Sequence, residues 1–446
     1  MSSVIIKDLS YIITMDKELR VLRNKSLFID GGKIRDIGDY ADLVRRYGVA
    51  DEIIDGKGKA ALPGLIDAHT HVVMVAMKGL VADLGDVIYS VYWPIEKLLT
   101  PDKVRALARL GILEAIKSGI TTIFDHYFFA EEIAKAAEEL GIRAFIGHTV
   151  MSWGGPWVGD SELNEALSFF KRWYGRSDTV KPVLAPHSPE TVSPSWLEYI
   201  RDIAREYNAL IHMHLSQTQK EVEDVKRRTG YTPVRLLNKL GLLNNNLLAV
   251  HVVFVDEEEL RMIASSGTIV AQTPSTYLLD GTPYHAYTLM RLGGKVVLGT
   301  DAPCYSDGID MFREMRNLIY TQRLLNRNPT IINAREVLSI ATISAAKALN
   351  IHELGCLCRG YIADVTLIDL RKPKFTPIHD AISSIVYTAT ASDVSDVIIN
   401  GKVLVKEGRY VHADEGKMMS EAEKVSKDLI LSAINENPKL KALLKV

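Results

Sequence analysis

The sequence has little of what marks a secreted, membrane-spanning or disulfide-stabilised protein. Its 446 residues include three cysteines, Cys304, Cys356 and Cys358, which are too few for a framework of disulfides and lack the spacing of a zinc knuckle. No apolar run reaches the roughly 18 residues that a transmembrane helix needs. Residues 1–20 mix charged with apolar side chains and lack the apolar core and cleavage site of a signal peptide. These absences favour a protein of the reducing cytoplasm.

An excess of charge of one sign is also missing. The 53 lysines and arginines nearly balance the 55 aspartates and glutamates, and the net charge is -2. Such a balance gives no electrostatic attraction for nucleic acid or for an anionic membrane surface, so we expect neither as a partner. The hydrophobic fraction of 47% and the charged fraction of 24% are ordinary for a soluble globular protein.

The order of β-rich and helical segments predicts the fold class. Residues 4–61 consist of short β-rich runs separated by Gly and Asp turns, whereas from residue 62 to about residue 349 such runs alternate with segments of helical periodicity. This alternation predicts a parallel sheet. The eight β-rich runs, from ALPGLIDAHTH to KVVLGTD, match the number of strands in a (β/α)8 TIM barrel. β-rich segments return after Leu349, as if to complete the N-terminal unit.

We therefore predict an α/β protein with three parts. Residues 62–349 form the barrel, residues 1–61 and 350–412 together form a discontinuous β domain, and residues 413–446 form a C-terminal helical extension. A chain of this length has room for one large domain and a smaller unit, because single cores stop growing at roughly 250 to 300 residues.

Histidines are concentrated at the ends of the predicted barrel strands. Any one of them alone is more simply explained as a core residue bonded to a carbonyl group. Because TIM barrels deliver catalytic side chains to their C-terminal face, the set as a whole indicates a shared site. Eight of the twelve histidines fall at or near the C-terminal ends of the first six strands: His69, His71, His126, His148, His187, His212, His214 and His251.

Two of these strands carry a His-x-His pair, and the side chains of each pair point to the same face because side chains alternate along a strand. His69 and His71 form one pair, and His212 and His214 form the other. Asp301 ends the eighth strand, which lies next to the first once a barrel closes. Imidazoles with one carboxylate suit a divalent metal that keeps a position open for water. A lone His-x-His pair occurs often by chance, but the two pairs on strands one and five, His251 on strand six and Asp301 on strand eight together predict a hydrolytic metal site.

These motifs resemble those of the amidohydrolase superfamily, in the branch of chlorohydrolases and of S-adenosylhomocysteine or methylthioadenosine deaminases. The resemblance extends over nearly the whole chain and includes LPGLIDAHTH, SGITTIFD, LAPHSPETVS, HMHLSQT, AVHVVFVDEEEL and LGTDAPCYSDGIDMFREMR. It implies a metal-bearing (β/α)8 barrel with a small β-sandwich built from both chain ends.

The resemblance also implies roles for the histidines. His69, His71, His214 and Asp301 become the metal ligands, and His251 becomes the strand-six histidine that contacts the attacking water or the substrate. Dinuclear relatives carry a carboxylated lysine at the end of strand four, where this chain has APHSP, so one divalent metal ion is expected. Zinc is the first choice, and iron or manganese could use the same ligands.

On the substrate side, the resemblance implies contacts from His187 and Glu96, with Glu96 accepting hydrogen bonds from sugar hydroxyls. Trp93 is a candidate wall of the pocket and His148 a candidate specificity residue, although similar deaminases tend to carry Arg in place of His148. Glu96 could equally be a surface carboxylate, and Trp93 a packing residue. The expected partner is a small heterocyclic substrate, and similar enzymes are often homodimers.

One position departs from the pattern of the branch. Similar enzymes have HLxET where this chain has HLSQT, so Gln217 replaces a glutamate that moves protons between the water and the leaving amine. A carboxamide forms hydrogen bonds but takes up no proton near neutral pH. Three explanations remain: catalysis by Asp301 and His251 alone, an introduced Glu to Gln change, or a weak or inactive relative. The segment QTPSTYLLDG departs as well, which leaves the shape of the substrate open.

The sequence therefore predicts a metal-dependent hydrolytic deaminase of an amino-purine nucleoside derivative or an amino-triazine. In this hypothesis metal-activated hydroxide attacks the ring carbon, Asp301 is both ligand and base, His251 stabilises the developing charge and Gln217 orients the ring. One alternative is a chlorohydrolase or ring-amide hydrolase with the same site. An alternative from another class is a non-catalytic metal-binding barrel.

Overall fold

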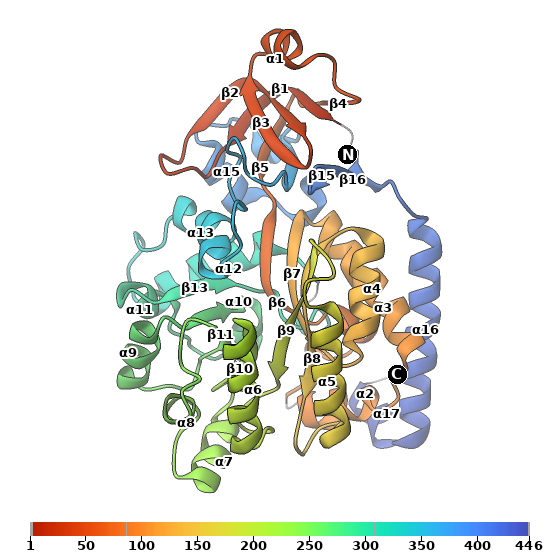
Figure 1. Ribbon diagram of the computed structural model, residues 1–446, viewed down its shortest axis with the longest axis vertical. Coiled ribbons are helices and arrows are strands. Elements are labelled where there is room, and N and C mark those ends of the chain that lie inside the picture. The colour runs from red at the N-terminus through yellow and green to blue at the C-terminus, as the bar shows by residue number, and fades with distance from the viewer. Residues whose placement is uncertain (1–2, 86, 307, 445–446) are drawn as a thin grey trace.

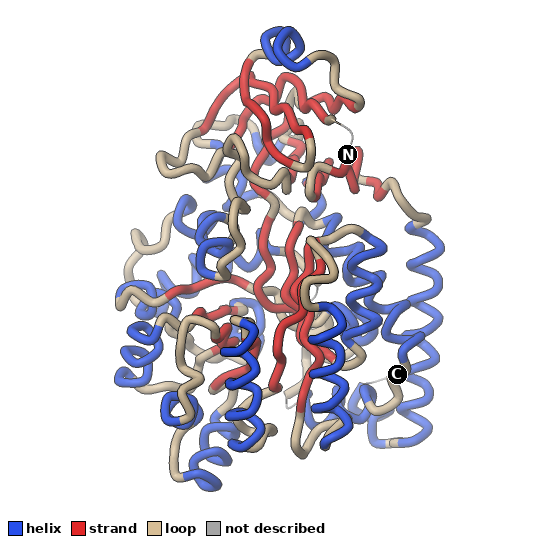
Figure 2. Tube along the Cα trace, viewed as in Figure 1, coloured by secondary structure: helices blue, strands red, loops and turns tan. Residues whose placement is uncertain are grey.

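A barrel of eight parallel strands forms the centre of the molecule (Figures 1 and 2). The computed structural model describes residues 3–85, 87–306 and 308–444. The barrel strands pair in sequence order and are β6 (Leu65–Thr70), β7 (Ile120–Tyr127), β8 (Arg143–Val150), β9 (Val180–Pro186), β10 (Ile211–Leu215), β11 (Leu247–His251), β12 (Ile269–Gln272) and β13 (Lys295–Leu298). They correspond to the eight β-rich runs of the sequence, so the predicted TIM barrel is confirmed.

The barrel closes where the residues that follow β13 meet β6. Asp301 and Thr70 form an isolated parallel bridge, and the backbone N–H of Asp301 donates to the carbonyl oxygen of His69 at 2.9 Å. Gly299 permits this approach, because a Cβ atom there would lie 2.7 Å from the same carbonyl oxygen. Closure therefore brings the end of the last strand against the His-x-His pair of the first.

Helices cover the outside of the barrel, and strands β6 to β12 are buried along nearly their whole length, as parallel strands between two layers usually are. The segment between β6 and the first long helix lies at the C-terminal end of β6 and contains η1 (Val72–Met77), η2 (Ile88–Tyr92) and α2 (Trp93–Glu96). The other helices of the barrel are α3 (Pro101–Lys117), α4 (Ala130–Leu140), α5 (Asp160–Trp173), α6 (Pro194–Tyr207), α7 (Gln219–Thr229), α8 (Pro233–Lys239), α9 (Glu257–Ser266), α10 (Pro274–Leu279), α11 (Ala286–Arg291), α12 (Met311–Leu325), α13 (Ala334–Ile340) and α14 (Ile343–Ala348).

A nine-stranded mixed sheet, built from both chain ends, lies at one end of the barrel (Figure 1). Ile6, Leu27, Val365 and Ile398, from four of its strands, share one buried core, so the sheet curves around its own apolar interior. The predicted β domain from both chain ends is confirmed, while its residue limits stay a prediction. Its strands are β1 (Val4–Ile13), β2 (Val21–Asp30), β3 (Lys33–Gly38), β4 (Glu52–Asp55), β5 (Lys59–Pro63), β14 (Val365–Asp369), β15 (Val394–Ile399), β16 (Lys402–Lys406) and β17 (Arg409–Tyr410), and its helices are α1 (Tyr40–Tyr47), η3 (Pro373–Phe375), α15 (Ala381–Thr388) and η4 (Ala391–Asp393).

A buried ion pair joins this sheet to the barrel. Arg143, at the start of β8, donates through two nitrogens to Asp364 at 3.1 and 3.2 Å, and both side chains are buried. Asp364 also accepts the backbone N–H of Asn400 at 2.7 Å. The chain itself connects the two parts where β5 of the sheet runs directly into β6 of the barrel. The ion pair between Arg143 and Asp364 adds a second connection between them.

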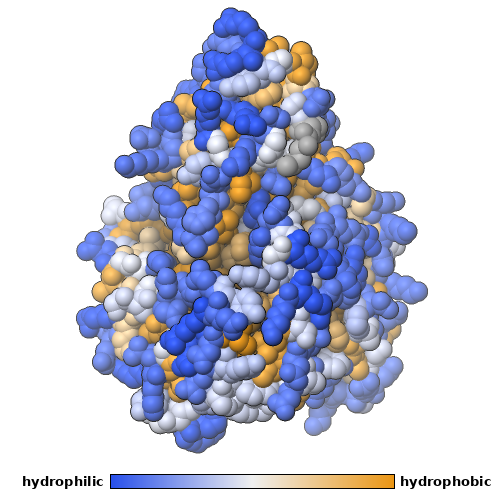
Figure 3. Space-filling model, in the orientation of Figure 1, coloured by the Kyte–Doolittle hydropathy of each residue, from blue (hydrophilic) through white to orange (hydrophobic). Residues whose placement is uncertain are grey.

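The C-terminal residues form α16 (Glu415–Glu436) and α17 (Lys439–Leu444), and α16 packs along the outside of α3 (Figure 1). The face in Figure 3 is largely hydrophilic, and hydrophobic residues show in several separate patches, one of them in a recess between the sheet and the barrel. Among the helices of the described ranges, none combines the length and the apolar character that crossing a bilayer requires.

The structure joins two of the three cysteines. Cys356 and Cys358, whose Cα atoms are 5.3 Å apart, are joined in a disulfide, whereas Cys304 is a buried free thiol. A single bridge between residues two apart is not a framework, so it does not contradict the sequence analysis, which did not predict the bridge because the Cα separation depends on the local turn.

Candidate active site

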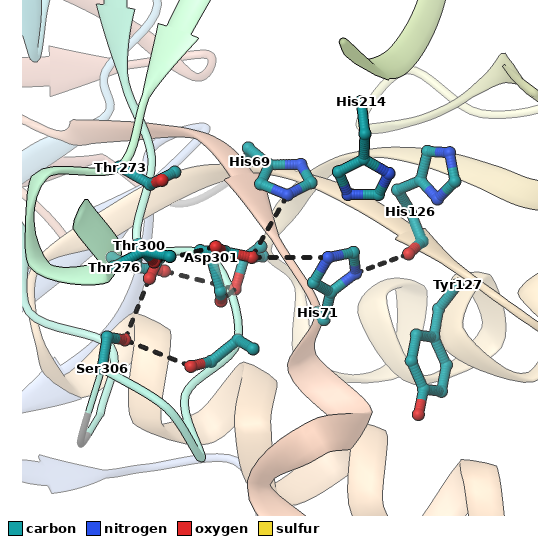
Figure 4. Close-up of polar contacts among 12 residues, drawn as sticks. His69, His71, His126, Tyr127, His214, Thr273, Thr276, Thr300, Asp301 and Ser306 are labelled. Carbon is teal, nitrogen blue, oxygen red and sulfur yellow. Dashed lines mark hydrogen bonds and ion pairs between the residues drawn. The ribbon is translucent and has the colours of Figure 1, made fainter. Parts of the chain in front are cut away.

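Five side chains from four strand ends converge at the C-terminal mouth of the barrel. They are His69, His71, His214, His251 and Asp301, and Figure 4 shows all of them except His251. Asp301 Oδ1 lies 3.4 Å from His69 Nε2 and 3.5 Å from His71 Nε2. The ligand atoms of His69, His71 and His214 lie within 4.8 Å of one another, and so do those of His69, His251 and Asp301. All five side chains are buried. The two overlapping groups share His69, so they surround one common point.

Backbone carbonyl groups orient two of these imidazoles. Nδ1 of His71 lies 2.6 Å from the carbonyl oxygen of His126, and Nδ1 of His214 lies 3.0 Å from that of His187. A carbonyl oxygen only accepts hydrogen bonds, so each Nδ1 carries the hydrogen and each Nε2 keeps a lone pair. This is the tautomer that a metal-binding histidine needs.

The other two imidazoles have side-chain partners. Nδ1 of His69 lies 2.9 Å from Nε2 of His212, and Nδ1 of His251 lies 3.2 Å from Oγ1 of Thr273. The Nε2 atoms of His69 and His251 are buried and have no hydrogen-bond partner among the described residues. Buried polar atoms are nearly always partnered in proteins. A cation with its bound water would satisfy both atoms, so the residues present fit a metal ion.

The protonation states also suit a cation. Burial lowers the pKa of His69 to about 3 and that of His251 to about 4, so both rings are neutral at pH 7. Burial likewise holds the pKa of His214 well below its ordinary value. The imidazoles around Asp301 keep its pKa below the usual range in spite of burial. The cluster therefore offers neutral nitrogen donors and one carboxylate.

The backbone at the mouth adopts conformations that L residues rarely take. The φ angles of Ser216, His251, Val252 and Asp301 are 50°, 77°, 55° and 62°. Hydrogen bonds between neighbouring strand ends hold this backbone, for example from the N–H of Val252 to the carbonyl of Leu215 at 2.9 Å. Such strain gathers at functional sites, where the surrounding structure compensates it.

Residues that the sequence analysis did not single out fix Asp301. Thr276 Oγ1 donates to Asp301 Oδ2 at 2.8 Å, which leaves Oδ1 directed at the histidines. Asp67, two residues before His69, accepts the backbone N–H of Thr300 at 3.0 Å and its hydroxyl at 2.6 Å. Asp67 therefore ties the residue before Asp301 to the strand that carries His69 and His71. In the sequence, the signal for this role was that Asp67 belongs to the LIDAHTH motif, together with His69 and His71.

A cavity of about 180 Å³ opens beside the cluster. Glu96, Trp93, His187 and Gln217 line it, as the resemblance implied, together with aromatic side chains from several loops. His148 instead lies with its Nε2 3.1 Å from Glu162 and is outside the described lining, so its contact with a substrate stays a prediction. The aromatic members of the lining are Tyr89, Tyr92, Trp93, Tyr127, Phe128 and Tyr305.

A model of the amidohydrolase family matches residues 60–404. The chain belongs to the amidohydrolase family. It is 37% identical over 431 residues to a 5-methylthioadenosine/S-adenosylhomocysteine deaminase of Dictyoglomus thermophilum, which covers 96% of this chain and 99% of that protein. It is 34% identical over 435 residues to a 5'-deoxyadenosine deaminase of Methanosarcina mazei, covering 96% and 99%. A crystal structure of an adenosine deaminase from Xanthomonas campestris with bound zinc has a TM-score of 0.90 and 27% identity, covering 96% of this chain and 98% of that one.

The match to the amidohydrolase family confirms the resemblance that the sequence motifs indicated. The protein is a hydrolase that acts on carbon–nitrogen bonds, as predicted. The histidine and aspartate cluster lies at the C-terminal face of the barrel, where TIM barrels place their active sites.

Glu221 fixes the backbone of the loop that presents Gln217 in this amidohydrolase. Its Oε1 accepts the N–H of Ser216 at 2.9 Å and its Oε2 accepts the N–H of Gln217 at 2.8 Å. The side chain is 2% exposed, and burial raises its pKa to about 7. Sequence reasoning missed this residue, although Thr218-Gln-Lys-Glu221 has the pattern of a helix capping box.

Replacing Glu221 by Gln should loosen this loop. At pH 8, where the carboxylate is ionised, the substitution removes one acceptor and sets an amide NH2 against a backbone N–H, so we expect a loss of about 2 kcal/mol in the free energy of unfolding. Urea unfolding measures the loss, and hydrogen exchange followed by mass spectrometry should show faster exchange in a peptide that spans residues 214–222. Glu223→Gln, an exposed change on the same helix, is the control and should alter stability by less than about 0.5 kcal/mol. Unchanged exchange in Glu221→Gln would contradict this role.

Proposed function

We propose that this amidohydrolase is a metal-dependent deaminase that removes the ring amine of an amino-purine nucleoside by hydrolysis. The observation that carries the proposal is the convergence of three imidazoles and one carboxylate on one point beside a cavity with aromatic walls. The deaminases of Dictyoglomus and Methanosarcina, named for adenosine derivatives, support a nucleoside over a triazine.

We propose His69, His71, His214 and Asp301 as the ligands of one divalent ion, with His251 next to it. The lone pairs on Nε2 of His71 and His214 and the unpartnered Nε2 of His69 support this set. The zinc in the Xanthomonas structure supports zinc as the ion. An ion held by these residues would supply a water activated for attack at neutral pH.

Asp301 is placed to take a proton from the attacking water. Its low pKa keeps the carboxylate ionised, and the bond from Thr276 to Oδ2 holds the carboxylate with Oδ1 directed at the histidines, next to the point where the water would be held. His251 faces the same point through Nε2. If the hydroxyl of Thr273 donates to Nδ1 of His251, Nε2 carries a hydrogen and can stabilise negative charge that develops during attack.

The remaining lining residues would hold the substrate. We propose that the carboxamide of Gln217 orients the purine ring by a hydrogen bond and that Glu96 accepts hydrogen bonds from the sugar. Glu96 is buried and accepts a hydrogen bond from the hydroxyl of Tyr127 at 2.7 Å. It is therefore a residue of the cavity wall and not a surface carboxylate. Trp93 and His187, with ring centroids 6.4 Å apart, would flank the nucleoside. A homodimer remains an expectation from the family resemblance.

Ammonia release from a panel of amino-heterocycles tests the function. We expect zinc-loaded protein to release ammonia from adenosine, 5'-deoxyadenosine or 5'-methylthioadenosine, with the ultraviolet change from adenine to hypoxanthine, and to act poorly on amino-triazines. A chelator should abolish the activity and added zinc should restore it, because the ligand set is the source of the activated water. Chloride release from chlorotriazines without deamination would favour the chlorohydrolase alternative. No turnover of any compound would favour the non-catalytic barrel.

Replacing Gln217 by Glu should raise kcat for the nucleoside that is turned over. A carboxyl group at this place can carry a proton to the ring nitrogen, a contribution worth about 10²-fold or more in general acid–base catalysis. Steady-state kinetics of the parent and the variant measure the gain, and Gln217→Met, which keeps the size of the side chain without its hydrogen bonds, is the matched control. A kcat that falls in Gln217→Glu would show instead that the NH2 group of the amide is needed.

Substrate binding should weaken as the pH falls through the pKa of Glu96. Burial raises this pKa to about 7, and the hydrogen bond from Tyr127 opposes the rise. Above pH 7 the carboxylate is ionised and accepts two hydroxyl hydrogen bonds, so we expect KM to increase from about pH 8 to about pH 6. Tyr127→Phe should move this increase to higher pH, and Glu96→Gln should remove it. A KM that is constant over this range in the parent would contradict the role of Glu96.

A further inference from the structure

The cavity has carboxylates in its walls and no basic side chain that could pair with an anion. Glu96 and Asp280 line it beside Asp301, whose charge the proposed divalent ion would offset, and within the described lining there is no lysine or arginine. Asp280 is held in the wall by the hydroxyl of Tyr305, which donates to its Oδ1 at 2.5 Å. Protonation of Glu96 would make that group neutral but not positive. The side chain therefore offers no positive charge to an anion in either protonation state.

The imidazoles of the lining already have partners within the protein. Nδ1 of His126 lies 3.0 Å from Oγ1 of Thr149, Nδ1 of His187 lies 2.8 Å from Oγ1 of Thr191, and Nδ1 of His214 lies 3.0 Å from the carbonyl oxygen of His187. His148 is directed at Glu162, with its Nε2 3.1 Å from a carboxylate oxygen of that residue.

Cations do occur in a neighbouring groove, which we call the outer groove. It shares Tyr89 and Trp93 with the cavity and is also lined by Lys220, Arg227 and Arg228. The three cations are already engaged with groups of the protein. Lys220 contacts Glu190 at 2.7 Å and Asp224 at 2.8 Å, Arg227 contacts Asp224 at 2.6 Å, and Arg228 donates to the carbonyl oxygens of Glu190 and Pro189 at 2.8 and 2.7 Å.

We propose that, within the deaminase function on which this inference rests, the site selects nucleosides whose 5' substituent carries no negative charge. A carboxylate on the 5' substituent loses its hydration in the cavity, meets the carboxylates of Glu96 and Asp280 and finds no lysine or arginine there, whereas a neutral thioether or alkyl group is accommodated by the aromatic walls. In the outer groove it would compete with Glu190 and Asp224 for Lys220, and with backbone carbonyl groups for Arg228. The cavity thus discriminates against an anionic 5' substituent by electrostatic repulsion as well as by shape.

A substrate series with tails of equal length tests the proposal. The compounds are 5'-deoxyadenosines that carry a butylthio, a 3-aminopropylthio or a 2-carboxyethylthio group at the 5' position, which give a neutral, a positive and a negative tail. We expect kcat/KM for the carboxylate to be about tenfold or more below that of the neutral compound, as for a like charge some ångströms away at the effective dielectric of a protein surface. The ammonium compound should equal or exceed the neutral one.

Two variants locate the discrimination. Asp280→Asn should raise kcat/KM for the carboxylate relative to the neutral compound by several-fold, because it removes the repelling charge at the rim. Lys220→Gln, in the outer groove, should leave the ratio unchanged. Calorimetric titration with the corresponding inosine products, which cannot be deaminated, should show the same order of affinities without turnover.

The outcomes distinguish a failure of this inference from a failure of the proposed deaminase function. Equal kcat/KM for the carboxylate and the neutral compound overturns the inference and leaves the deaminase function intact. A carboxylate preference that disappears in Lys220→Gln also overturns it and assigns the tail to the outer groove. The absence of both ammonia release and product binding overturns the deaminase function, and the inference with it.

Discussion

The closing contact between the last and the first barrel strand is the constraint on which the site depends. The N–H of Asp301 bonds to the carbonyl of His69, and Asp67 holds Thr300 through both its N–H and its hydroxyl. These residues are more than 230 positions apart in the sequence, so only the completed barrel brings the carboxylate to the imidazoles. The left-handed φ of 62° at Asp301 turns its side chain into the mouth at a cost that this closure compensates.

The same barrel mouth makes the histidines neutral and directional. Burial disfavours the imidazolium form, and carbonyl groups at the ends of β7 and β9 hold the hydrogen on Nδ1 of His71 and His214. In the absence of a cation, such a set would leave buried nitrogen atoms unpaired, which is unfavourable. The cluster is therefore built for a bound ion rather than for the stability of the barrel alone.

The described walls of the cavity next to this centre contain no lysine or arginine. Aromatic rings provide a large apolar surface, Glu96 and Gln217 add a few directed polar groups, and the charge that remains is negative. This combination suits a flat, uncharged heterocycle with hydroxyl groups. It differs from a pocket made for an anionic ligand, in which arginine or lysine is expected.

Strand periodicity and histidine spacing were enough to predict the barrel, its eight strands, the β domain from both chain ends and a gathering of histidines at the barrel mouth. These features follow from alternation along strands and from the common edge at which parallel strands end. The selection of His69, His71, His214 and Asp301 as ligands, with His251 beside them, came from the family resemblance. The contacts of Thr276, Glu221 and Tyr127, the orientation of His148 toward Glu162 and the disulfide between Cys356 and Cys358 could not be predicted, because each depends on the path of a loop or on one side-chain rotamer.

The most direct test of the account is the number and position of metal ions in active protein. Elemental analysis combined with anomalous diffraction at the zinc absorption edge should find one ion per chain, about 2.1 Å from Nε2 of His69, His71 and His214 and from a carboxylate oxygen of Asp301. Active protein that contains no transition metal, or an ion bound away from these four residues, would contradict it.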